Sequence, residues 1–255
     1  MYAVAKAKAK NIIDEFGFVS PNEIDLELIA ADMNVYIDSK KIEGAEGRIT
    51  HNGKYGYITV NNKIKLNTKI KFIIAHELGH FKLHFNNNKF YNCSSNVFSR
   101  WTSINDPETE ANTFAAELLM PESMFLKKTK AKYPSTDLIK QLANEFNSSI
   151  IATAFRYSDI GQHPTAIIYC QDGKIKWSNS NKDFRYKFIR PGNEVSKNSY
   201  VYNYFYEDYN STRYEKVLLD AWYLEDNNYK KDKYIFEQMI YYPEFNGVLV
   251  LLWDY

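Results

Sequence analysis

The segment FIIAHELGHFKLHF, Phe72–Phe85, constrains the fold most, because it sets ionisable side chains at helical spacing within a strongly apolar stretch. His76 and His80 are four residues apart, so on a helix they share nearly one azimuth and can direct one ring nitrogen each at the same point. With Glu77 they form the pattern H-E-x-x-H, in which the histidines hold a metal ion. The alternative is a buried helix that contains histidines without binding anything.

The apolar residues of this segment favour a helix that lies in the core. We expect it to begin near Asn67 or Thr68 and to end by the asparagines at 86–88. One face is apolar and leaves His76 and His80 on the opposite side, which could then form the floor of a cleft. The apolar residues are Ile74, Leu78, Phe81 and Phe85.

Glu77 follows His76 directly, about 100° away around the helix. Its carboxylate is therefore badly placed to be a third ligand, but it can reach a water molecule bound to the ion. Such a water has a lowered pKa and becomes the nucleophile, with Glu77 as the general base.

A second helix is predicted in DPETEANTFAAELLMP, with Asp106 as N-cap, Pro107 at the first position and an end before Pro121. It carries the downstream carboxylates that could supply a third protein ligand, which a catalytic site needs together with an open position. Glu110 and Glu117 share one stripe of this helix, whereas Glu108 lies nearly opposite. Glu108 and Glu110 thus cannot both face the ion, and spacing alone does not choose between them.

The rest of the first part of the chain combines helices with strands. A helix is predicted at residues 2–16, and Ser20, Pro21 and Glu23 form a capping box that would open a second helix. From Val35 the pattern favours strands, with a hairpin around Asn52-Gly53 in GRITHNGKYGYITVN. Its second strand, YGYITVN, is either an edge strand on which an extended substrate adds or a purely structural strand.

Further helices are predicted at residues 122–131, 136–146 and 149–158, and strand–turn–strand patterns follow from Gly161 to the end. We therefore place a domain boundary near residue 160. Residues 136–158 are similar to a helix-turn-helix. Arg156 is nearly the only positive charge on the second of these helices, so packing against the core is favoured over reading DNA.

The overall composition does not point to a nucleic-acid or membrane partner. A formal net charge of +1 gives no overall attraction to nucleic acid or to an anionic membrane. Lysines interrupt the apolar start MYAVAKAKAKNII, and VLVLLW is too short to span a bilayer, so no membrane association is expected. Cys93 and Cys170 lie far apart without a CxxC spacing, which fits a reduced cytoplasm.

AHELGHFKLH and ETEANTFAAELLMP together resemble the ImmA/IrrE family of bacterial metallopeptidases, whose signature is HELGH plus a helix E-A-N-x-F-A-x-x-L-L-M-P. The likeness extends to the hairpin ending in YITVN, the helical segment after LLMP and the closing hairpin ending in LLW. It implies an α+β fold. The resemblance implies a zincin-like metallopeptidase domain over residues 1–160, with a sheet, an active-site helix and a helical subdomain. We expect a small α/β C-terminal domain over residues 161–255, which in the family can resemble a GAF-type sensor fold.

The resemblance also assigns roles to residues. It implies that His76, His80 and Glu110 are the metal ligands and that Glu77 is the general base. Zinc is the expected metal, although the same donors accept manganese. The implied activity is cytoplasmic endoproteolysis of an XRE-type helix-turn-helix repressor, which relieves repression of a mobile-element or stress operon. Members often carry a fused XRE-type domain at the N-terminus. This chain starts too close to the peptidase to hold one, so we expect the repressor to be a separate protein.

Two alternatives belong to other classes. The protein could be a non-catalytic regulator that binds a repressor or senses a ligand through the C-terminal domain. It could also bind DNA directly through residues 136–158, a disfavoured reading. Around the site, His84 is expected to support a ligand or simply to pack rather than to bind metal. Glu117 either bonds a ligand histidine or is exposed.

Overall fold

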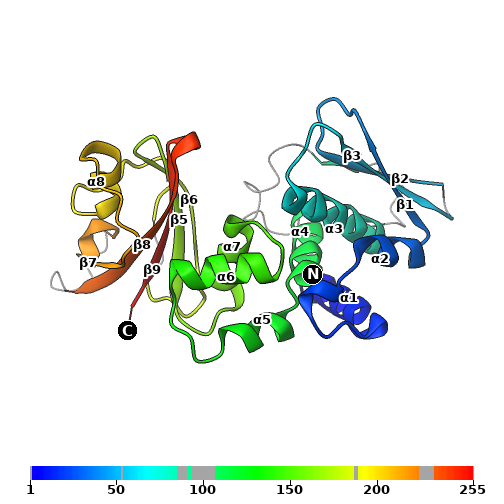
Figure 1. The fold of residues 1–255 in the computed structure, drawn as a ribbon, viewed down its shortest axis with the longest axis horizontal. Coiled ribbons are helices and arrows are strands. Elements are labelled where there is room, and N and C mark those ends of the chain that lie inside the picture. Colours follow the sequence, from blue (N-terminus) through cyan, green and yellow to red (C-terminus); the bar gives the residue numbers. More distant parts are fainter. Residues whose placement is uncertain are drawn as a thin grey trace. The chain divides into compact units, whose positions relative to one another are not determined.

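The computed structural model of the chain describes residues 2–52, 54–84, 91–93, 107–186, 189–223 and 233–254. The chain divides into two compact units, each with its own sheet (Figure 1). The first unit contains Met1–Phe125 and Ala143–Ser149, and the second contains Leu126–Leu142 and Ile150–Tyr255. The units interleave along the chain between residues 126 and 149, and the boundary expected near residue 160 stays a prediction.

The first unit joins a mixed sheet to helices. Its strands are ordered β1-β3-β2-β4, with β1 parallel to β3 and the other pairs antiparallel. The strands are β1 Val35–Lys40, β2 Gly47–His51, β3 Gly56–Asn61 and β4 Tyr91–Cys93, and the helices are α1 Tyr2–Phe16, α2 Leu26–Asp32, α3 Asn67–His84 and α4 Pro107–Leu119.

The predicted hairpin is confirmed as β2 and β3, with His51 opposite Gly56. The connection runs over residues 52–55, where Asn52 Oδ1 accepts from the backbone N–H groups of Lys54 and Tyr55 at 3.1 and 2.8 Å. Of the two alternatives for YGYITVN, the structure excludes the edge strand. β3 is paired on both sides because β1 adds to it in parallel, so its backbone is already committed to the sheet.

The capping box is present but caps a different element. Ser20 and Glu23 bracket a short 3-10 helix, Pro21–Glu23. The α-helix that follows begins only at Leu26, where the Asp25 carboxylate accepts from the N–H groups of Glu27 and Leu28. An Asp at this position satisfies two unpaired donors of the first turn and so forms the N-cap of α2.

Helix α3 lies between the sheet and helix α4 (Figure 1). Phe72 to His80 are all buried, so the helix is covered on every side at its middle rather than on one apolar face. Phe85 of the expected apolar face and the expected helix end at residues 86–88 lie outside the described residues, as does the expected N-cap Asp106. Helix α4 starts at Pro107 and ends before Pro121 as predicted.

The second unit is built on an antiparallel sheet of order β6-β5-β9-β8-β7. All seven residues of β9 are buried, which explains its unbroken apolar sequence. Asp172 and Gly173 have φ of 53° and 72°, as a tight turn between β5 and β6 requires. The strands are β5 Thr165–Gln171, β6 Lys174–Ser180, β7 Glu215–Leu218, β8 Tyr234–Tyr242 and β9 Gly247–Trp253.

The predicted helices after Pro121 are present. They are α5 Glu122–Thr129, α6 Thr136–Glu145 and α7 Ile150–Ile160, and α8 Tyr200–Tyr206 comes later. Helix α7 packs on β5 and β6, with the Phe155 and Trp177 ring centroids 4.8 Å apart. Arg156 on α7 is only 2% exposed and lies 3.5 Å from Asp159, so the charge that might have read DNA faces the interior.

Candidate metal centre

Gly79 allows helices α3 and α4 to approach closely. A Cβ at this position would lie 3.1 Å from Ala111 Cα and 3.2 Å from Ala111 O, closer than most Cβ contacts. Because both neighbouring atoms are backbone, a side chain here would push α4 away. The glycine inside HELGH therefore brings the first turns of α4 against His76 and His80.

Three side chains with metal-binding donor atoms converge at this crossing. The Nε2 atoms of His76 and His80 are 3.0 Å apart. The two carboxylate oxygens of Glu108 lie 3.3 Å from them, one each. Of the described residues, these three form the group of His, Cys, Asp and Glu side chains that could hold a metal ion.

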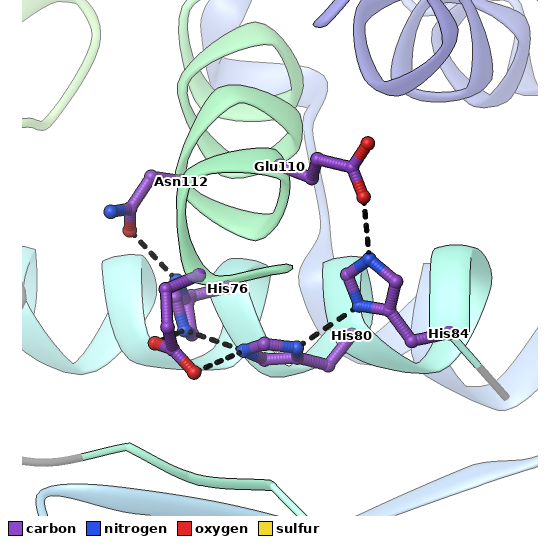
Figure 2. A network of polar contacts seen from close by, with 6 residues as sticks. His76, His80, His84, Glu110 and Asn112 are labelled. Atoms are coloured by element: carbon purple, nitrogen blue, oxygen red, sulfur yellow. Dashed lines mark hydrogen bonds and ion pairs between the residues drawn. The ribbon is translucent and has the colours of Figure 1, made fainter. Parts of the chain in front are cut away.

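Each histidine has a further partner on its other ring nitrogen (Figure 2). His76 Nδ1 lies 2.8 Å from Asn112 Oδ1 on α4, and His80 Nδ1 lies 3.2 Å from His84 Nδ1. His84 Nε2 in turn lies 2.8 Å from Glu110 Oε2. Contacts of this kind fix ring orientation and tautomer in metal sites.

The network selects the tautomers. If His76 donates Nδ1–H to the Asn112 oxygen and His80 donates Nδ1–H to His84, both Nε2 atoms carry lone pairs that face each other and the Glu108 carboxylate. Three electron-pair donors at this spacing repel unless a cation lies between them. Tetrahedral zinc with bonds near 2.05 Å needs donors about 3.3 Å apart, so the donor set fits a divalent ion.

The protonation states of His80 and Glu108 also fit a site for a divalent ion. Burial lowers the pKa of His80 to about 4, and the neighbouring Glu108 carboxylate opposes this shift. Burial acts to raise the pKa of Glu108, but the adjacent His76 and His80 rings outweigh this effect and hold the pKa below its usual range. At neutral pH the imidazole is neutral and the carboxylate ionised, the forms that bind metal.

Glu77 is fully buried on the side of α3 that faces strand β2. A Cβ on Gly47 would lie 2.8 Å from Glu77 Oε1 and would overlap Ile73 Cγ2, so this glycine leaves the room that the carboxylate occupies. Glu77 thus adjoins the histidine pair in sequence while its carboxylate packs against the sheet.

The structure brings some of the predicted site residues together and separates others. His76 and His80 come together as expected, but the carboxylate beside them is that of Glu108, and Glu110 instead contacts His84. Glu117 is buried and its Oε1 accepts from the Glu122 N–H at 3.0 Å, so the exposed reading of Glu117 is wrong. Sequence reasoning missed Asn112, although its spacing of four residues from Glu108 puts both on one side of α4.

A family model matches residues 30–158, half of the chain, and is described as the IrrE N-terminal-like domain of the M78 peptidases. The chain belongs to the ImmA/IrrE family. The matched range contains both histidines and Glu108.

Individual relatives agree with this assignment. Metallopeptidase ImmA of Bacillus subtilis (strain 168) is 27% identical over 165 residues, which cover 64% of this chain and 89% of that protein. Uncharacterized immunity region protein 2 of Bacillus phage phi105 is 28% identical over 122 residues, or 48% of this chain and 71% of that protein.

A solved structure of a Mycobacterium tuberculosis transcriptional regulator matches the present chain with a TM-score of 0.57 at 15% sequence identity. The match covers 98% of the present chain and 87% of the regulator's chain. At this identity the likeness shows the fold alone. Of the helices in the described part of the chain, none combines the length and apolar character that a membrane-spanning segment needs.

Proposed function

We propose that the protein is a metal-dependent endopeptidase whose ion is held by His76, His80 and Glu108. The observation that carries the proposal is the convergence of two imidazole nitrogens and one carboxylate within 3.0 to 3.3 Å. Two histidines and one glutamate with an open position form the donor set of catalytic zinc sites.

A divalent ion bound there would supply Lewis acidity, polarising a peptide carbonyl and acidifying water. Glu77 has the role of general base, taking the proton of the attacking water and passing it to the leaving amine. Glu77 directly follows His76 on helix α3, and its burial keeps bulk solvent away from the carboxylate. Zinc suits the donors best, and manganese is the second candidate.

The substrate we propose is an XRE-type helix-turn-helix repressor, cleaved in the cytoplasm to relieve repression of a mobile-element or stress operon. Support comes from the relatives: one is a metallopeptidase, and the phage relative is named for an immunity region. The composition adds that the chain has no strong net charge with which to bind DNA itself.

The test is incubation of the zinc-loaded protein with an XRE-type helix-turn-helix repressor, with cuts mapped by mass spectrometry. We expect one or a few cuts, and a loss of about 10²- to 10⁴-fold in Glu77→Gln, which retains the metal ligands. The matched control is Glu27→Gln on helix α2, where the side chain is exposed. Stable binding of the repressor without cleavage by the wild type would replace the proposal with a non-catalytic regulator.

A further inference from the structure

Glu110 and His84 form a hydrogen-bonded pair that the proposed ligand set does not use. The Glu110 carboxylate lies 2.8 Å from His84 Nε2, and His84 Nδ1 lies 3.2 Å from His80 Nδ1. Figure 2 shows the three side chains in a continuous line from Glu110 on helix α4 through His84 to the His80 ring. His84 is buried, and the Glu110 side chain is 18% exposed.

The chemistry of the chain of contacts sets the direction of each bond. An ionised carboxylate only accepts, so His84 gives its Nε2–H to Glu110. With Nε2 as its donor, His84 can accept at Nδ1 from His80 Nδ1–H. His80 is left with its lone pair at Nε2, on the side of His76 and Glu108.

We propose that Glu110, acting through His84, is a positioning residue that holds His80 in the tautomer and orientation that bind the metal. The inference rests on the proposed metal site and extends it from three ligands to a supporting line of Glu110, His84 and His80. Asn112 does the same for His76 with a single contact, so the two ligand histidines are oriented by different means. Residues supporting a ligand in this manner change metal affinity about 10- to 100-fold when removed.

A double-mutant cycle distinguishes a positioning role of Glu110 from a role as a direct metal ligand. We expect Glu110→Ala and His84→Ala each to weaken Co²⁺ binding about 10- to 100-fold, measured from the visible absorption of the bound ion. The double variant should bind no more than about threefold more weakly than His84→Ala alone, because Glu110 acts only through His84. If Glu110 were a ligand, its removal would cost as much without His84 as with it.

A conservative variant distinguishes positioning from folding. The amide oxygen of Glu110→Gln can still accept from His84 Nε2–H, so this variant should recover most of the Co²⁺ affinity, while apo variants should melt near the wild-type temperature. Two variants serve as controls, Glu27→Ala and His163→Ala. Glu27 is exposed on helix α2, and the native His163 ring stacks on Tyr133 in the second unit. Additive losses in the cycle would overturn the positioning role alone. A wild type that binds no divalent ion would overturn the proposed function as well.

Discussion

The close approach at Gly79 can be tested by adding one methyl group. In Gly79→Ala the new Cβ would lie 3.1 Å from both Ala111 Cα and Phe114 Cδ1 and 3.2 Å from Ala111 O. The ring can turn, but the Ala111 backbone must retreat by a few tenths of an ångström with the whole of helix α4. Glu108 and Asn112 flank Ala111, so their side chains move relative to the histidines.

The expected change in the free energy of unfolding of Gly79→Ala is the sum of two opposing effects. Replacing a helical glycine by alanine stabilises by about 1 kcal/mol, whereas overpacking costs about 1–3 kcal/mol, so the net loss of stability should be about 0–2 kcal/mol. Functional groups need placement within about 0.5 Å, and a shift near that limit should weaken zinc binding about tenfold, or about 1.4 kcal/mol.

The assay pairs denaturant unfolding of the apo protein with zinc affinity by competition against a chromophoric chelator. Gly79→Leu should continue the trend with a larger loss of both quantities. If Gly79→Ala is stabilised by about 1 kcal/mol and binds zinc with wild-type affinity, helix propensity alone acts there and the reasoning about the helix approach is refuted.

Three further predictions concern other parts of the molecule. Gly47→Ala should displace the Glu77 carboxylate, reducing cleavage about 100-fold while zinc affinity stays at the wild-type value; equal losses of both would contradict this. Zinc at 100 times its dissociation constant should raise the free energy of unfolding by about 2.7 kcal/mol, reversibly with EDTA, and a similar rise in Glu108→Ala would exclude this ligand. Burial raises the pKa of Glu237 from 4.5 to about 7, against hydrogen bonds from the Trp222 indole and the Val201 N–H. Between these pH values the folded state holds one proton more than the unfolded state, so stability should fall by about 3 kcal/mol as pH rises from 4.5 to 7 and then level off. Denaturant unfolding of Glu237→Gln should lack most of this slope, and an unchanged slope would assign it elsewhere.

The sequence predicted the elements of the site better than their pairing. His76 and His80 follow from spacing within one helix, which is a local property. The choice between Glu108 and Glu110 depends on how α4 crosses α3, and that crossing is set by the Gly79 contact with Ala111, which no helical wheel contains.

The same distinction explains the differences in the fold. The hairpin of β2 and β3 is local and was predicted, whereas the parallel addition of β1 to β3 joins residues about twenty positions apart and leaves no signal in either strand. The start of helix α2 depends on whether Ser20 or Asp25 caps the longer helix, and both have the right side chain.

The central claim is that His76, His80 and Glu108 hold the metal ion. The most direct measurement is anomalous diffraction at the zinc edge from crystals of the zinc-loaded Glu77→Gln variant. We predict a single strong peak about 2.0–2.1 Å from the Nε2 atoms of both histidines and about 2.0–2.2 Å from a Glu108 oxygen, with Glu110 still bonded to His84. A peak bonded to Glu110 in place of Glu108, or no peak at the two histidines, would contradict the account.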